Sequence, residues 1–533
     1  VQVAGTTRLS AGGDIDLQAA GNRFGDAVAV QGRQVTLAST DPLQLQGVTA
    51  DSLIARSGGH LSLGAAGIAG NATIEGASLL LDGATIGGTL LATAHAGAIR
   101  QGSGSLAIGN NSQLTASTDI VLDGTGNQLG SALQVQGRDI TLSSSTALDI
   151  QQLQAARDAV LAGNGVRLGT TSVQGTLQVN STGAITQSAA LQVAGNSRFQ
   201  AGSDITLDQA GNRFDGSVGL DGGNVAVTTS GGLLLDRVSA SGNLDARAGS
   251  AGVSQQAAVQ VGGRSDIRTQ GAIVLDRADN RFTGAVGLDG KGVDLRAAGD
   301  LQIDRLNNAG QSDIRLHAGG GLQLPTSAID AGTGNLTLLA DGGVLQANAL
   351  LAGNNVTLTG RDGVRLGGDL RSGGSLTLSS SNADIVQIAA PNGVGGSVQA
   401  AGVVQVNAGS GRIALGNAGN RFGGALNLSG GDINVAADTL LLGSVNAGGT
   451  LSLASAGDIR QQGAVQVAGT TRLSAGGDID LQAAGNRFGD AVAVQGRRTP
   501  DPVRGRRCRQ CDAAGPAAAL RHDTCGWQPA GHG

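Results

Sequence analysis

A long internal repeat constrains this chain more than any other feature of its sequence. Residues 465–497 repeat residues 1–33 letter for letter, and shorter copies lie between the two blocks. An Asn-Arg-Phe triplet marks the copies, and it begins at Asn22, Asn212, Asn280, Asn420 and Asn486, with a looser Asn-Gln-Leu version at Asn127. Self-similarity of this kind decides an architecture, because each copy forms the same unit and packs on its neighbours.

Apolar residues recur at fixed distances from the triplet. Around Asn212, for example, Ile205 and Leu207 precede the triplet, and Val218 and Leu220 follow it. Each pair has a spacing of two, which is the period of a strand with one buried face. The pattern returns about every 20 residues, which is the length of one coil of a β-solenoid.

Composition favours the same fold. The chain has 92 Gly among 533 residues, aromatic residues make up 1%, and almost all of the charged residues are Arg or Asp. Few long helix formers and many turn formers argue for short strands joined by turns. One coil leaves backbone groups unpaired on both edges, so coils must stack to be stable. We therefore predict an all-β protein, a parallel β-helix (β-solenoid) of roughly 20-residue coils.

The repeat pattern ends with residue 497. Residues 498–533 hold all three Cys, the only Trp and four of the seven Pro. We predict a rod of β-helix repeats over residues 1–497 and a non-repetitive, disordered tail over residues 498–533. A frameshift, recombination or assembly junction at the long repeat would also produce such a tail, which would then not be native.

The tail carries the one metal-ligand pattern of the chain. Two residues separate Cys508 from Cys511, and two separate His522 from Cys525, a spacing that zinc sites use. These four residues are a candidate zinc set only. We predict no cofactor for the chain.

The repeat region offers no catalytic pattern. Glycoside hydrolysis, which some β-helix proteins perform, needs two opposed carboxylates. Aspartates instead recur in repeated turn contexts, at Asp14, Asp204, Asp432 and Asp478. The three histidines of the region have ordinary repeat neighbours, and they are His60, His95 and His317. We predict that the aspartates cap turns, that the histidines are isolated on the surface, and that the chain is not an enzyme.

Charge and hydropathy exclude further classes of protein. The net charge of -5 gives no basic footprint for nucleic acid. No run of about 18 apolar residues occurs, so we predict no transmembrane helix. No signal peptide is visible, and a chain without Met that starts at Val1 is expected to be a piece of a longer protein.

The repeats resemble those of the filamentous haemagglutinin type of large bacterial exoprotein, which is secreted by the two-partner route. The resemblance rests on the block from Gly21 to Leu37 and on two segments, Ala96 to Gln101 and Ala456 to Gln461, and it covers about residues 1 to 497. It implies a right-handed β-helix that an outer-membrane two-partner transporter exports and that folds outside the cell.

The resemblance also implies a function. It predicts the structural stalk of a secreted, cell-surface-associated adhesin, a fibre that attaches to receptors or glycans on host cells or bacteria. The alternative is the stalk of a contact-dependent growth-inhibition toxin. A third reading, a β-helical polysaccharide-degrading enzyme, predicts a cluster of Asp on one face within a few neighbouring coils. The secretion domain of the family is not seen in this sequence, and no binding residue can be carried over.

Overall fold

The computed structural model describes residues 1–19, 21–388 and 395–496 of the chain. These residues form 64 short strands and no helix, so the prediction of an all-β protein is confirmed. The strands pair in parallel and stack as a β-solenoid of about 24 turns, with coils about 20 residues apart, as predicted. The predicted tail and its zinc candidates Cys508, Cys511, His522 and Cys525 lie outside the described residues, and the boundary at residue 497 stays a prediction.

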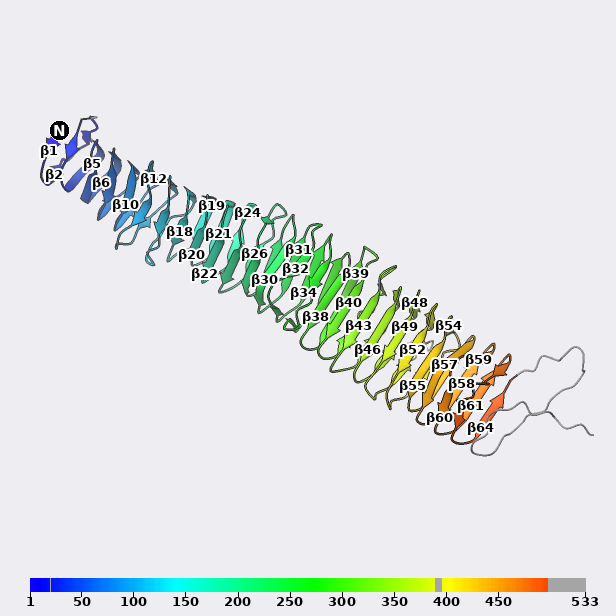
Figure 1. Ribbon diagram of the computed structural model, residues 1–533. Coiled ribbons are helices and arrows are strands. Elements are labelled where there is room, and N and C mark those ends of the chain that lie inside the picture. The colour runs from blue at the N-terminus through cyan, green and yellow to red at the C-terminus, as the bar shows by residue number, and fades with distance from the viewer. Residues whose placement is uncertain (20, 389–394, 497–533) are drawn as a thin grey trace, which may run out of the picture. The chain divides into compact units, whose positions relative to one another are not determined.

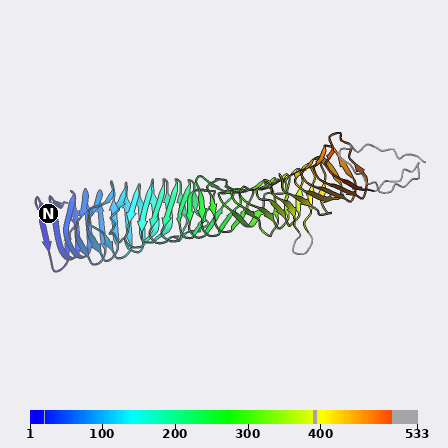
Figure 2. The ribbon, with the colours of Figure 1, turned by 90° about the horizontal axis from the view of Figure 1, so that it is seen from below.

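The described residues form two compact units, which divide between Gly271 and Ala272. In the first unit, coloured blue to green, strands of successive coils lie side by side (Figures 1 and 2). One column of this unit includes β26 (Ile205–Leu207), β29 (Val225–Thr228), β31 (Leu244–Ala248) and β34 (Ser265–Thr269). A second column includes β22 (Leu177–Ser181), β25 (Ser197–Ala201) and β28 (Val218–Gly222).

Register in the first column follows the predicted period. Ile205 pairs with Val225, Val225 with Leu244 and Leu244 with Ser265, which gives coils of 20, 19 and 21 residues. Because the pairing is in register, inward side chains stack directly on one another from coil to coil. Small changes of coil length are therefore absorbed in the turns and not in the strands.

The second unit contains a longer column of the same kind. Its strands are β35 (Ile273–Leu275), β38 (Val293–Ala297), β40 (Ile314–Ala318), β43 (Leu336–Ala340), β46 (Val356–Gly360), β49 (Leu376–Ser379), β52 (Val404–Asn407) and β55 (Leu426–Gly430). Their first residues pair in order along the column, from Ile273 to Leu426. The step from Leu376 to Val404 is the longest, at 28 residues, so this coil carries an insertion outside the column.

The core is a stack of aliphatic layers. In β43, Leu336, Leu338 and Ala340 are buried, whereas Thr337 and Leu339 alternate with them on the outer face. Each fully buried Leu or Val adds roughly 1.5–3 kcal/mol, so many thin layers replace one wide core.

Four of the five Phe residues of the triplets are buried, and Phe488 is half-buried. Phe24, Phe214, Phe282 and Phe422 are 3–5% exposed. Phe199 packs its ring edge to face against Phe214, with ring centres 6.2 Å apart. The narrow column has room for few rings, which explains the low aromatic content.

Candidate functional site

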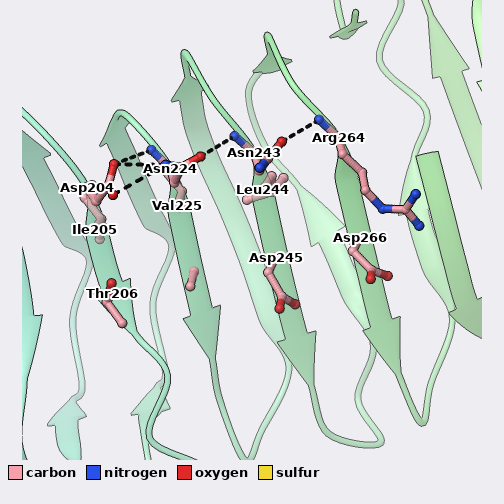
Figure 3. A pocket seen from close by; sticks show the side chains of 11 residues that line it. Asp204, Ile205, Thr206, Asn224, Val225, Asn243, Leu244, Asp245, Arg264 and Asp266 are labelled. Atoms are coloured by element: carbon pink, nitrogen blue, oxygen red, sulfur yellow. Dashed lines mark hydrogen bonds between the residues drawn. The ribbon is translucent and has the colours of Figure 1, made fainter. Parts of the chain in front are cut away.

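A ladder of Asp and Asn side chains runs along one corner of the first unit, where the strands of the β26–β34 column begin (Figure 3). Asp204 Oδ1 accepts a hydrogen bond from the N–H of Asn224 at 2.8 Å. Asn224 Oδ1 accepts one from the N–H of Asn243 at 3.0 Å, and Asn243 Oδ1 one from the N–H of Arg264 at 2.8 Å. Each bond joins one coil to the next, so the side chains satisfy backbone donors at the corner between strands.

The same bond recurs in both units. Further examples join Asp158 to the N–H of Thr176, Asn355 to the N–H of Ser375 and Asp432 to the N–H of Thr450, at 2.7, 3.0 and 2.8 Å. Asp and Asn can therefore both make this hydrogen bond, because it needs only one side-chain oxygen as the acceptor.

A groove of about 300 Å³ follows the ladder in the first unit (Figure 3). Its floor consists of outward side chains of the strands, including Thr206, Asp245 and Asp266. The side chains repeat at the strand spacing of about 4.8 Å. The groove therefore presents hydrogen-bonding groups in a regular row.

Two carboxylates of the groove stand opposite each other on neighbouring strands. Asp245 on β31 and Asp266 on β34 are in register, and so are Arg247 and Arg268. Like charges in this arrangement repel. Asp245 accepts hydrogen bonds from Arg247 at 2.7 and 3.1 Å, and Asp266 accepts one from Arg268. Each strand thus balances its own charge.

A polysaccharide-degrading enzyme is predicted to have a cluster of Asp on one face within a few coils. Asp204, Asp245 and Asp266 form such a cluster in the groove. Each of the three carboxylates accepts hydrogen bonds from donors of the chain itself. The residues that line the groove include no aromatic platform for a sugar ring. The arrangement is suited to hydrogen bonding along a row of groups.

The predicted turn aspartates act between coils rather than within their own turns. Asp14, like Asp204 and Asp432, accepts from a backbone N–H of the following coil, that of Gln34. For Asp478 the structure shows its N–H donating to Asp458 at 2.9 Å. The sequence predicts turn caps without saying which coil supplies the donor, and for Asp14, Asp204 and Asp432 the N–H at the corner belongs to the next coil.

These bonds lower the pKa of several carboxyl groups. The N–H and then the hydroxyl of Thr450 lower the pKa of Asp432, and Thr176 lowers the pKa of Asp158 in the same way. For Asp14 the largest cause is the hydrogen bond from the Arg33 guanidinium. Donors aimed at the charged form stabilise it, so all three remain ionised to lower pH than a free carboxyl group.

A charged cluster on β38 and β40 of the second unit behaves differently. Burial raises the pKa of Asp294, which pairs in register with Arg315. Beside Arg315, His317 places Nε2 2.5 Å from Asp341 Oδ2, and its side chain is only 12% exposed. His317 is therefore not the isolated surface residue that the sequence predicted.

The other two histidines lie on the surface of the first unit. His60 and His95 are both exposed. His60 Nδ1 lies 2.8 Å from the hydroxyl of Ser78. Within residues 1–19, 21–388 and 395–496, no group of three or more His, Cys, Asp or Glu could hold a metal ion.

Sequence reasoning missed the function of the triplet Asn. Asn127, Asn212, Asn280 and Asn420 are 0% exposed. Four triplet or triplet-like Asn residues exchange hydrogen bonds with a Gln of the preceding coil, in the pairs Gln101–Asn127, Gln187–Asn212, Gln387–Asn420 and Gln461–Asn486. We call each pair an amide lock. Each of these Gln follows an Ile by two residues, and this recurrent Ile-x-Gln was the available signal.

Comparison with known proteins gives one family. The family described as repeats of unknown function (DUF5649) matches residues 1–31, 69–136, 156–221, 222–289, 353–429 and 430–495, which is more than half of the chain. No curated protein and no solved structure is significantly similar to it. The part of the chain that the structure describes has no helix long and apolar enough to cross a membrane.

Proposed function

The chain belongs to the family of repeats of unknown function (DUF5649), and from this premise we propose that it is the structural stalk of a secreted, surface-associated bacterial adhesin of the filamentous haemagglutinin type. An outer-membrane two-partner transporter exports it, and a module elsewhere in the protein contacts receptors or glycans on other cells. The proposal concerns a mechanical function, in which the coils hold that module away from the cell.

The observation that supports this proposal most is the column of eight strands in the second unit, from β35 to β55. Each strand between β35 and β55 in this column pairs with the strand of the coil before it and with that of the coil after it. A structure built from nearest-neighbour contacts extends by adding coils, without a larger core. Secretion and attachment rest on the resemblance of the repeats to haemagglutinin-type exoproteins.

A deletion that keeps the register tests the stalk. Leu336, Val356 and Leu376 occupy the same place in successive coils. Deleting residues 336–375 therefore removes two whole coils and brings Leu376 to the place of Leu336. Deleting residues 336–365 instead joins strands out of register and is the matched control. Both deletions are made in the protein of the source bacterium.

The first deletion should leave surface display and attachment to target cells intact, whereas the second should abolish display. Display is measured by antibody labelling of intact cells, with and without the transporter gene. Normal display with lost attachment would place the binding site in the deleted coils and contradict a purely mechanical function. Labelling that is independent of the transporter would contradict the export route.

The stalk of a contact-dependent growth-inhibition toxin is the first alternative. Its coils would have the same mechanical function, so the deletion of residues 336–375 would leave display unchanged here too. The readout that separates the two is growth of a competing strain in co-culture. Inhibition that needs cell contact would favour the toxin, and attachment without inhibition would favour the adhesin.

A polysaccharide-degrading enzyme is the second alternative, because the groove gathers Asp204, Asp245 and Asp266. If this reading holds, the purified chain depolymerises a polysaccharide, and Asp245→Asn with Asp266→Asn abolishes the activity. The exposed Asp480→Asn is the control for this pair. Depolymerisation that persists in the double variant would place the activity outside the groove.

A further inference from the structure

We infer that the amide locks fix the register in which the coils of this solenoid stack. This inference is independent of the proposed function, because it concerns how the coils find their neighbours. It rests on the buried hydrogen bonds of the triplet Asn residues and on the uniformity of the surrounding aliphatic ladders.

The lock at Asn212 connects three successive coils. Asn212 Oδ1 accepts hydrogen bonds from Gln187 Nε2 at 2.8 Å and from the N–H of Leu191 at 2.9 Å. Asn212 Nδ2 donates to Gln187 Oε1 at 2.8 Å. It also donates to the carbonyls of Leu207 and Thr228, both at 3.1 Å. The amide thus uses donors and acceptors of the preceding coil, its own coil and the following coil.

The lock at Asn420 in the second unit has the same partners. Asn420 Oδ1 accepts from Gln387 Nε2 and from the N–H of Val398, both at 2.8 Å. Asn420 Nδ2 donates to the carbonyls of Leu415 and Ala436, both at 3.0 Å. Both Asn residues are 0% exposed. Two independent units therefore contain the same buried network.

The aliphatic ladders by themselves specify register weakly. Ile205, Val225 and Leu244 occupy the same place in successive coils, so one aliphatic residue replaces another there. Every coil also presents the same row of N–H and C=O groups to the next. A slip by one whole coil keeps the inward and outward alternation, which a slip by one residue would destroy. Errors of a whole coil are characteristic of repeat proteins.

An amide lock distinguishes one coil from another because a buried amide must find its partners. In a stack that skips the coil of Gln187, Leu168 would take the place of Gln187 beside Asn212, because Leu168 and Gln187 are in register. An amide buried without partners carries its full desolvation cost. Buried polar residues specify register in other repetitive assemblies for the same reason.

Cysteine cross-linking can measure register directly. Arg167 on β21 (Val166–Val173) pairs with Thr186 on β23 (Ile185–Gln187), and Ile185 pairs with Ile205, so that Thr186 lies beside Thr206. A disulfide between positions 186 and 206 reports the native stack. One between positions 167 and 206 reports that the coil of Gln187 was skipped, because two strand spacings, about 10 Å, exceed the reach of a disulfide. The experiment uses the full chain with Cys508→Ser, Cys511→Ser and Cys525→Ser.

After unfolding and oxidative refolding, the chain with Asn212 should form the 186–206 cross-link and almost none of the 167–206 cross-link. Asn212→Leu should raise the 167–206 fraction by on the order of tenfold, the factor expected for one lost buried hydrogen bond. Gln192→Leu is the matched control. It removes an exposed hydrogen bond between the same two coils, from Gln192 to the carbonyl of Gly211, and should leave the 167–206 fraction unchanged.

Two further variants cover a chain that fails to fold. Gln187→Leu removes one partner, and Gln187→Leu with Asn212→Leu replaces both amides by apolar groups. Both should raise the 167–206 fraction, because Leu at position 187 no longer differs in kind from Leu168 of the coil before it. A native 186–206 cross-link without any rise of the 167–206 fraction in these variants would overturn the inference, because the amides would then add stability without setting register.

Discussion

Asn420 and Gln387 exchange two hydrogen bonds, of 2.8 and 3.1 Å, although 33 residues separate them along the chain. At Gln187 and Asn212 the separation is 25 residues. The coil that contains the longer separation also has the longest step of its column, from Leu376 to Val404. Extra residues are therefore accommodated elsewhere in the coil while the lock keeps its geometry.

Asn420→Ala should destabilise the second unit locally. The change leaves the N–H of Val398 and two carbonyls without their partner, whereas the amide of Gln387 keeps other hydrogen bonds. Buried groups left unpaired cost about 1–3 kcal/mol each, so we expect a loss of at least about 3 kcal/mol in the opening free energy around β51 (Val398–Ala400). Hydrogen exchange of the Val398 amide measures this loss.

Asn434→Ala is the control for this prediction. Asn434 lies exposed on β56 (Ile433–Ala437), two residues before Ala436 in the coil that follows Asn420. A surface change of this kind should alter the opening free energy by less than about 0.5 kcal/mol. Equal exchange rates at Val398 in the two variants would contradict a structural function for the Asn420 network.

The period of the coils could be predicted from the sequence because it depends on local alternation. Ile205 and Leu207 recur with a spacing of two, and burial of one strand face requires that spacing. The amide locks could not be predicted in this way. Gln187 and Asn212 lie 25 residues apart, and only the stacking of coils brings their amides together.

The turn aspartates show why a local pattern can mislead. The sequence places Asp432 at the start of a strand, where a cap of its own turn is the usual interpretation. In the solenoid, however, the next coil presents the N–H of Thr450 at the same corner. The charged cluster at Asp294 and His317 could likewise not be predicted from the sequence, because the pairing of β38 with β40 depends on the length of the coil between them.

Acid should weaken the bond between Asp432 and Thr450. The native pKa of Asp432 lies below its usual value of 3.8, so its contribution to stability is complete above that value and is lost as the pH falls through the native pKa. Asp432→Asn should keep both hydrogen bonds, as Asn355 does with Ser375, and should remove this pH dependence. The stability of the native chain should therefore fall relative to that of the variant between pH 5 and pH 2.

Thermal unfolding of both proteins across that pH range tests this expectation. Asp158→Asn should behave in the same way, because Thr176 donates equivalent hydrogen bonds to Asp158. If the unfolding temperatures of the native chain and of both variants fall equally with pH, the bonds to these carboxylates do not contribute to acid unfolding.

Gly130→Ala should destabilise the first unit. Gly130 has a φ of 80°, and a methyl group there would collide with the carbonyl oxygen of Asn110 in the preceding coil. Strain of this kind costs about 1–3 kcal/mol, and the collision adds to it. Gly12→Ala is the control, because no atom lies within 4 Å of the place of its Cβ. Urea unfolding followed by hydrogen exchange should give a lower unfolding midpoint for Gly130→Ala than for Gly12→Ala. Equal midpoints for the two variants would contradict the prediction.

The rings of Phe199 and Phe214 should stabilise each other beyond the area that they bury. Their centres lie 6.2 Å apart with planes at 79°, an edge-to-face geometry that is worth about 0.5–1.5 kcal/mol. A double-mutant cycle with Phe199→Leu, Phe214→Leu and both together isolates this coupling, because Leu keeps most of the apolar volume. Phe422→Leu in the second unit, combined with Phe199→Leu, provides the distant pair that should be additive. A coupling between Phe199 and Phe214 no larger than that of the distant pair would mean that the two rings only fill the corner.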